Sequence, residues 1–396
     1  MTEYHCPDCS KVPTSDGIDS PTLATFAERD AATKLGERCL RLEDDLRLAK
    51  ARAVTAERRA ATAERLREAV FGLRSTPADA PTWATERATD ASGLPHVAIL
   101  VTSDFQWGEV IDPENMDGVN EFNIEIAERR YRTLVEKTLD ISFVHLATNT
   151  YSGMIYLRLG DEVSGDIHQE LRETNELSAV PAVRSLVAAE TWGLRALAER
   201  FGKVHVISVP GNHGRTTLKP PTKRVADNYD TLSAWWLEDT FKSDERFSWQ
   251  TPTSTDAVFE LHGRLYLATH GDNIGSRGGQ GFVGPAATIL RGMKKTSDEY
   301  ARRGVALSKM FVGHFHTAYD LGYGWSNGSL PGYSEFARVN RMTPEPPLQW
   351  LLFMHPRYGA TSQWKVLLEP EPHPGRWQPA HPRLHARSWR VECSGK

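Results

Sequence analysis

The chain has 396 residues, 40% of them hydrophobic, and a formal net charge of −4 at pH 7. These values exclude a disulfide-stapled miniprotein, a disordered chain and a strongly charged binder of polyanions, and they allow one large domain or two smaller ones. Four unevenly spaced cysteines, with no signal-peptide pattern and no apolar run long enough to cross a membrane, predict a soluble cytoplasmic protein without membrane contact.

The N-terminal part of the chain divides into three expected segments. Residues 1–23 are predicted to be a flexible N-terminus, where Cys6 and Cys9 form half of a zinc-ribbon spacing; the alternative is a zinc site shared between two chains. Residues 24–72 carry apolar side chains at alternating steps of four and three, which predicts a coiled-coil helix and a homo-oligomer, with a solvated single helix as the alternative. Residues 73–95 lack periodicity and indicate a linker.

From residue 96 onward, short apolar runs alternate with longer segments of helical spacing. The strand-like runs are residues 96–104, 141–149, 153–161, 203–212, 265–272 and 308–316. The helix-like segments are residues 120–139, 177–201 and 227–241. This alternation predicts a layered α/β domain over residues 96–370, followed by a basic tail over residues 371–396 that contains proline and tryptophan.

Polar residues follow five of the strand-like runs. They are Asp104 and Gln106, Asp161, Asn212 and His213, His270 and Asp272, and His314 and His316. Carboxylates, carboxamides and imidazoles are ligands suited to manganese, iron, zinc or magnesium, and ligands in α/β folds gather at the carboxyl ends of strands. Glycines precede several of these residues, and we expect Gly160, Gly211 and Gly313 to permit sharp turns or close backbone approach.

These five ordered blocks resemble the motifs of the calcineurin-like metallophosphoesterase superfamily, which are D-x-H, G-D, G-N-H-D/E, a histidine before glycine, and G-H-x-H. The resemblance covers about residues 96–340, and the Asn327-Gly328-Ser329 that follows the last block is closer to the nuclease-like and phage-type members. The resemblance implies a four-layer αββα sandwich and two divalent metal ions, with manganese foremost and iron, zinc or magnesium as alternatives.

The resemblance also implies a role for each motif residue. Asp161 would bridge both ions, Asp104 and His316 would complete the first site, and the second would be held by Asn212, His270 and His314. His213 would face the substrate and either protonate the leaving oxygen or steady the phosphoryl group. Two cations held this way lower the pKa of a bridging water and neutralise charge on the phosphoryl oxygens.

Two positions depart from the motifs. Gln106 stands where the superfamily usually has histidine, and we expect its amide oxygen to bind the first metal more weakly than imidazole would. Gly214 stands where many members carry an acidic residue that orients the histidine before it. We therefore expect another group to position His213, and Asp272 is one candidate.

Other residues have ordinary and functional interpretations. Arg215 is expected to hold a substrate phosphate, and His168 is expected to reach the substrate or to cap the helix that follows it. We expect the remaining histidines of apolar runs to be core residues, namely His96, His145, His205, His262 and His355. The basic cluster of Arg291, Lys294, Lys295, Arg302 and Arg303 indicates a solvated helix face or a phosphate contact, and residues 279–284 indicate a mobile glycine-rich loop.

The function predicted from these residues is hydrolysis of phosphodiester bonds by a hydroxide that bridges two metals. Nucleic acid is the expected substrate, held by a local contact, because the basic cluster and a tail with Trp377 and Trp389 suit strands with stackable bases. One alternative is a phosphomonoesterase acting on phosphoprotein or a small nucleotide. The other is a degenerate phosphoesterase that acts as a coiled-coil scaffold.

Overall fold

The computed structural model describes residues 38, 50, 81, 83, 95–147, 149–219, 223–274, 286–339 and 342–369. The chain divides into two units, Met1–Val70 and Phe71–Lys396. In the first unit the described residues Arg38 and Lys50 are helical and exposed. The coiled-coil seam, the Cys6 and Cys9 pair, the glycine-rich loop and the basic tail lie outside the described residues, so these expectations stay predictions.

The second unit contains a six-stranded sheet with the strand order β11-β10-β1-β2-β3-β4. Its strands are β1 His96–Thr102, β2 Tyr151–Arg158, β3 Val204–Ser208, β4 Phe247–Gln250, β10 Leu348–His355 and β11 Gly359–Leu367. Strands β1 to β4 are parallel, whereas β10 is antiparallel to β1. The loops after β1, β2 and β3 therefore leave the same edge of the sheet.

A second, five-stranded sheet has the order β5-β6-β7-β9-β8. Its strands are β5 Asp256–Leu261, β6 Arg264–Thr269, β7 Leu307–Val312, β8 Tyr319–Leu321 and β9 Gly324–Ser326. Strands β6, β7 and β9 are parallel to one another. The loops after β6 and β7 consequently also share one edge.

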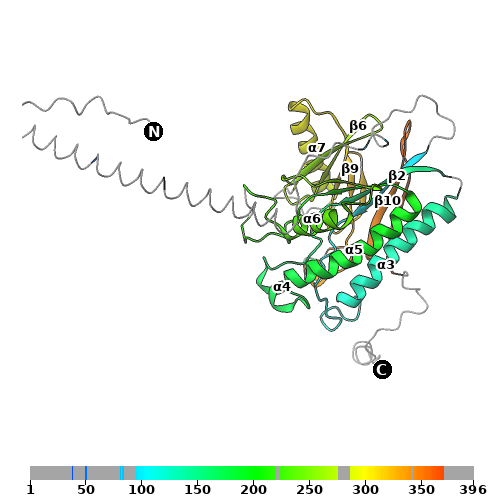
Figure 1. Ribbon diagram of the computed structural model, residues 1–396. Helices are drawn as coiled ribbons and strands as arrows, with labels where there is room; N and C mark the ends of the chain where they lie inside the picture. Colours follow the sequence, from blue (N-terminus) through cyan, green and yellow to red (C-terminus); the bar gives the residue numbers. More distant parts are fainter. Residues whose placement is uncertain are drawn as a thin grey trace, which may run out of the picture. The chain divides into compact units, whose positions relative to one another are not determined.

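Capping residues bound some of the helices of the second unit. The helices are α3 Ile124–Asp140, α4 Gln169–Thr174, α5 Ala179–Phe201, α6 Tyr229–Phe241, α7 Ala286–Arg302 and α8 Glu335–Val339. The Asn123 side chain accepts from the Ile126 N–H at the start of α3, and α5 ends at Gly202, whose φ of 76° suits glycine. Figure 1 shows α3 and α5 side by side, in agreement with their contacts. None of the helices in the described parts of the chain is long and apolar enough to span a membrane.

The alternation of side chains along β1 connects two hydrophobic cores. Ala98 and Leu100 belong to the core formed with α3, α5 and α6, whereas Val97, Ile99 and Val101 belong to a core shared with the five-stranded sheet. A strand buried on both faces needs apolar residues at every position, which explains the continuous run from residue 97 to residue 101. The mixed α/β fold predicted from the sequence is confirmed.

The predicted strand over residues 141–149 is wrong. Residues Ile141–His145 form a π-helical turn that continues α3. Leu139, Phe143 and Leu146 pack against the core formed with α3, α5 and α6. Their spacing of four and three residues is helical. Packing of these side chains therefore outweighs the strand preference of the β-branched residues.

The expected burial of His145 is also wrong. Its side chain is 54% exposed and its Nδ1 lies 3.2 Å from Asp140 Oδ2. In a helical turn this imidazole falls on the solvent side, whereas a strand would have placed it against the core. Of the other four histidines expected in the core, His205 and His355 are buried and His96 and His262 are half-buried.

Replacing His205 with glutamine is expected to remove part of the acid sensitivity of the fold. Burial lowers the pKa of His205 to about 4, and its Nδ1 lies 2.8 Å from Ser248 Oγ. Because an unfolded histidine has a pKa of about 6.5, the unfolded state binds this proton first. The free energy of unfolding should therefore fall as pH drops from about 6.5 to about 4, by on the order of 3 kcal/mol.

Urea unfolding of the wild type and the His205→Gln variant over this pH range measures the effect. We expect a shallower pH dependence for the variant. An identical dependence in the two proteins would contradict the role given to this imidazole.

Candidate metal centre

The candidate ligands lie where parallel strands of both sheets end. The loops after β1, β2 and β3 of the six-stranded sheet supply Asp104, Gln106, Asp161, Asn212 and His213. The loops after β6 and β7 of the five-stranded sheet supply His270, His314 and His316. One site is therefore built from five loops that are far apart in the sequence.

Several of these residues have an uncommon backbone conformation. Among the described non-glycine residues, eight have positive φ, and five of them are candidate ligands: Asp104, Gln106, Asp161, His314 and His316, with φ between 48° and 68°. Left-handed backbone costs free energy in residues that carry a Cβ, and it concentrates at functional sites. The strain here turns side chains from strand ends toward a common centre.

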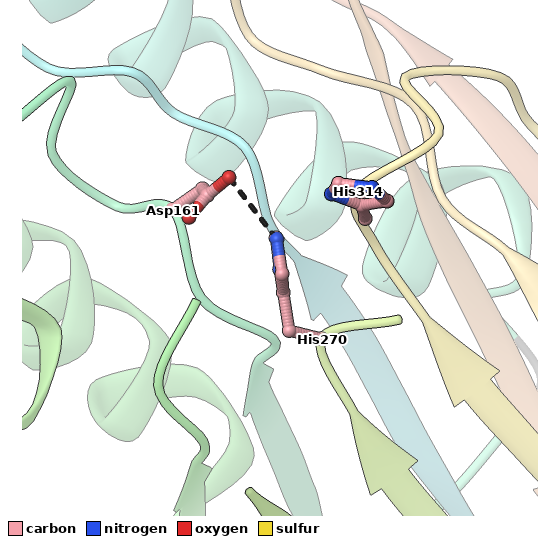
Figure 2. Close-up of side chains that lie close together, drawn as sticks. All are labelled: Asp161, His270 and His314. Atoms are coloured by element: carbon pink, nitrogen blue, oxygen red, sulfur yellow. Dashed lines mark ion pairs between the residues drawn. The ribbon is translucent and has the colours of Figure 1, made fainter. Parts of the chain in front are cut away.

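Asp161, His270 and His314 form the centre of the site (Figure 2). Each offers one ligand atom, and these atoms all lie within 4.8 Å of one another, so the three residues could hold a metal ion. His270 Nε2 lies 3.0 Å from Asp161 Oδ2 and 3.0 Å from Asn212 Oδ1. The His270 Nδ1 is 2.8 Å from the Leu159 carbonyl oxygen, which leaves Nε2 directed at the other ligands.

A second group of candidate ligands also reaches Asp161. His316 Nε2 lies 3.1 Å from Asp104 Oδ1, and Gln106 Nε2 lies 3.5 Å from Asp161 Oδ2. The Gln106 Oε1 atom is buried and has no hydrogen-bond partner among the described residues. A buried acceptor without a partner is costly, and a cation is a partner that would satisfy it. The donor set therefore fits a metal, including at the position that departs from histidine.

The electrostatics of the site also suit a cation. Burial alone would raise the pKa of Asp161, but His270 and His213 together hold it below its ordinary value. Burial opposes protonation of His270, yet the Asp161 carboxylate raises the pKa of this histidine to about 10. Burial and the neighbouring His270 lower the pKa of His314 to about 4. The buried Asp161 carboxylate thus favours a positive charge next to it, which a proton on His270 can supply. A metal ion bound to His270 would replace this proton and release it.

His213 lies at the edge of this group and is 19% exposed. Its backbone N–H donates to Asp161 Oδ1 at 2.6 Å, and its Nδ1 lies 3.0 Å from the Ser164 carbonyl oxygen. The expectation that Asp272 orients this imidazole is wrong, because the Ser164 carbonyl holds the ring from the loop after β2. A backbone carbonyl leaves no side-chain signal in the sequence.

The two residues expected to bind substrate flank His213. The rings of His168 and His213 have centroids 5.2 Å apart. His168 occupies the N-cap position of α4, but its side chain makes no capping hydrogen bond. Arg215 Nε donates to the Asn212 carbonyl oxygen at 2.9 Å, and Arg215 and Asp272 line a small cavity of about 50 Å³.

The segment Asn327-Gly328-Ser329 is buried and does not face a substrate. The Asn327 Nδ2 donates to Gln349 Oε1 at 2.6 Å and to Ser103 Oγ at 3.0 Å, and the Ser103 N–H donates to Gln349 Oε1 at 3.0 Å. These bonds hold the loop that carries Asp104. Sequence analysis missed Gln349, whose only signal is a polar residue inside an apolar strand.

Sequence analysis also missed Glu109, which lies three residues after Gln106. Burial raises the pKa of Glu109 to about 7, and this carboxyl helps Asp104 to raise the pKa of His316. Its position in a loop beside the ligands is decided by tertiary structure, and a lone glutamate in the sequence gives no such indication.

The predicted close approach at glycines of the ligand loops is confirmed. A Cβ atom on Gly211 would lie 2.2 Å from both Asp161 N and Asp161 Oδ1. A Cβ atom on Gly313 would lie 2.8 Å from Asp104 Oδ2. Gly160 combines a φ of 88° with a Cβ position 2.3 Å from Gly211 N. The loops after β1, β2, β3 and β7 can therefore meet only where side chains are absent.

The basic cluster lies on and directly after α7 and is exposed. Lys294 Nζ pairs with Asp298 Oδ2 at 2.6 Å, and the Arg303 guanidinium lies 4.8 Å from the Tyr300 ring centroid. These contacts agree with a solvated helix face. The alternative of a phosphate contact stays a prediction.

Comparisons with known proteins add little to this geometry. No family model matches the sequence, and a comparison with curated proteins finds no relative. Among solved structures, the chain is similar to Thermus thermophilus sulfate thiohydrolase SoxB in complex with glycerol, at 9% identity and a TM-score of 0.27. The match covers 70% of this chain and 58% of that chain, which is less than two thirds of its length. A TM-score this low does not define a shared fold.

Proposed function

We propose that this protein is a metal-dependent phosphoesterase that hydrolyses phosphodiester bonds, with nucleic acid as its substrate. One observation carries the proposal: the buried Asp161 carboxylate is close to candidate ligands of both groups, because its Oδ2 lies 3.0 Å from His270 Nε2 and 3.5 Å from Gln106 Nε2. A carboxylate shared by two donor groups is what keeps two cations close together.

The proposal assigns the candidate ligands to two ions. Asp104, Gln106 and His316 would hold one, Asn212, His270 and His314 would hold the other, and Asp161 would contact both. Bound divalent cations supply a nucleophile at neutral pH and neutralise the charge of the phosphoryl oxygens. Manganese is the proposed metal, because a set of carboxylate, amide and imidazole ligands without thiolate suits it.

His213 is proposed to be the proton donor to the leaving oxygen. Its Nδ1 lies against the Ser164 carbonyl oxygen, which can only accept, so Nδ1 carries a proton in every state of the ring. The second proton of the cationic ring is then on Nε2, which lies 3.9 Å from Asp161 Oδ2 and faces the site. As the bond from phosphorus to the leaving oxygen breaks, Nε2 can give this proton to that oxygen and the ring stays held through Nδ1.

Arg215 and His168 are proposed to bind substrate phosphate. Both lie beside His213, with Arg215 in the Asn212 loop and the His168 ring 5.2 Å from that of His213. A guanidinium suits phosphate oxygens because it donates two parallel hydrogen bonds. In this proposal, the substrate phosphate would bind on the side of the site where His213 lies.

The four-layer αββα sandwich and the homo-oligomer belong to the same proposal. A core between the two sheets and separate cores against helices on the other faces support the sandwich. Oligomerisation would come from the predicted coiled coil over residues 24–72, and the five exposed basic residues of α7 and the turn after it offer a local contact for nucleic acid.

The test compares hydrolysis of bis(p-nitrophenyl) phosphate and p-nitrophenyl phosphate by chelator-treated protein after addition of Mn²⁺, Mg²⁺, Zn²⁺ or Fe²⁺. We expect Mn²⁺ to restore hydrolysis of the diester above that of the monoester, and His213→Ala to reduce it by about 10²-fold or more. Single-stranded DNA, double-stranded DNA and RNA then identify the polymer.

Two outcomes would replace the proposal. A preference for the monoester would favour a phosphomonoesterase. Less than one equivalent of bound metal, with no activity lost in His213→Ala, would favour a degenerate scaffold.

A further inference from the structure

The glycine at position 214 leaves a space that another part of the chain fills. A Cβ atom on Gly214 would lie 2.3 Å from Asn228 Oδ1 and 2.9 Å from Asp230 Oδ2. Asn228 is the N-cap of α6, and Asp230 lies in the first turn of that helix. A carboxylate therefore occupies the place beside Gly-Asn-His although the residue that follows this motif has no side chain.

The Asp230 carboxylate binds the backbones of two ligand loops at once. Its Oδ2 accepts from the Asp161 N–H at 3.0 Å and from the Gly211 N–H at 2.8 Å. Its Oδ1 accepts from the Glu162 N–H at 3.1 Å. The side chain is fully buried, and a buried carboxylate with three N–H donors forms strong charge-assisted hydrogen bonds. The Asp230 side chain therefore holds the loop of Asp161 and the loop of Asn212 in a fixed position relative to each other.

The backbone of Asp230 is held by neighbouring residues of α6 and its N-cap. The Asp230 N–H donates to Asn228 Oδ1 at 2.8 Å, and Asn228 Nδ2 donates to the Gly211 carbonyl oxygen at 2.8 Å. The Ser233 hydroxyl donates to the Asp230 carbonyl oxygen at 2.7 Å and accepts from Arg158 at 2.8 Å. Because α6 is anchored to β2 in this way, Asp230 has little freedom to follow a displaced loop.

We propose that Asp230 is the positioning residue of the metal centre. Its carboxylate, which comes from α6, occupies the space of the acidic side chain that is missing at Gly214. It is neither a proposed metal ligand nor a proposed substrate-binding residue. It fixes the distance between Asp161, which follows β2, and Asn212, which follows β3. The consequence for metal binding rests on the proposed function, whereas the clamp between the two loops does not.

The central test is the Asp230→Asn variant, titrated with Mn²⁺ alone by calorimetry. The amide keeps the size of the side chain but replaces one acceptor oxygen with a donor, which cannot receive a backbone N–H. We expect the affinity for Mn²⁺ to fall by about 10- to 100-fold in protein that remains folded. The matched control is Asn123→Ala, which removes the N-cap of α3 and should lower stability without changing Mn²⁺ affinity.

Hydrogen exchange measured by mass spectrometry tests the clamp without any metal. In Asp230→Asn, peptides covering residues 159–163 and 209–213 should exchange faster, and peptides from β10 should not. Gly214→Ala serves as the second variant, because its methyl group would displace both Asn228 and the Asp230 carboxylate without removing either side chain. We expect faster exchange of the same two peptides.

The two proposals fail in different ways. Wild-type protein that binds no Mn²⁺ would overturn the proposed function, and the exchange experiment would still decide the role of Asp230. Wild-type protein that binds Mn²⁺, together with a folded Asp230→Asn variant of equal affinity and unchanged exchange in both peptides, would overturn the assignment of Asp230. Should Asp230→Asn fail to fold, Gly214→Ala with unchanged exchange and Mn²⁺ affinity would overturn it.

Discussion

Asp161→Asn is expected to prevent the site from binding two metal ions at once. Diester hydrolysis should fall by about 10³-fold or more, because several kcal/mol of charge stabilisation would be lost. The carboxylate is buried and lies 3.0 Å from His270 Nε2. An amide has the same shape but no charge, so it cannot hold two cations close together. Calorimetric titration with Mn²⁺ and the initial rate of diester hydrolysis measure the two effects.

The control for this variant is Asp140→Asn, the same chemical change at a side chain that is 52% exposed. It changes an exposed contact with His145 Nδ1, and exposed contacts of this kind contribute little to stability. We expect wild-type metal binding and rates from the control. If Asp161→Asn retained two equivalents of Mn²⁺, the central role of this carboxylate would be wrong.

Gly211→Ala is expected to disrupt the same site through packing, without removing any ligand. The added Cβ would lie 2.2 Å from Asp161 N and from Asp161 Oδ1, so the loops after β2 and β3 must separate. Overpacking of this kind costs about 1–3 kcal/mol or more in stability. We expect Mn²⁺ affinity and hydrolysis to fall toward those of Asp161→Asn, with a lower urea midpoint.

Gly322→Ala is the matched control, because a Cβ atom at Gly322 would meet no atom within 4 Å. The same methyl group at this position should leave metal binding and rates unchanged. Normal Mn²⁺ affinity in Gly211→Ala would mean that the two loops are more adaptable than their contacts indicate.

The backbone of several candidate ligands is strained, so the loops that carry them depend on close contacts with their neighbours. Asp104, Asp161 and His316 hold φ values of 52°, 54° and 51°, a region that costs L-residues free energy. The close contacts of Gly160 and Gly211 and the hydrogen bonds of Asp230 hold the loops around these residues. Metal binding would further increase the free energy of unfolding, because only the folded chain brings the ligands together.

Local patterns were sufficient to predict much of the fold and the candidates for the site. The runs at residues 96–104, 153–161 and 203–212 combine a buried strand with a glycine or polar residue at its end, and both properties are visible within about ten residues of sequence. The structure places the predicted ligands in one neighbourhood because parallel strands direct their carboxyl ends to a common edge. Their function as ligands is the subject of the tests above.

Where local signals competed, prediction from the sequence was wrong. Residues 141–149 contain β-branched residues typical of strands, yet Leu139, Phe143 and Leu146 have helical spacing and pack onto the core. The same error placed His145 in the core, although it is 54% exposed. The choice between two local tendencies depends on which side chains can reach a core, and that depends on the rest of the fold.

The sequence by itself determined the class of fold, the order of the motif residues and the glycines that let loops approach one another. Tertiary structure alone decided how these residues are held: Ser164 contacts His213 through a backbone carbonyl, Gln349 holds the Asp104 loop across 246 residues, and Asp230 lies against Asp161 from 69 residues away. The physical reason is that strand and turn formation depend on neighbouring residues, whereas a buried polar group must find its partner wherever the packed chain brings one.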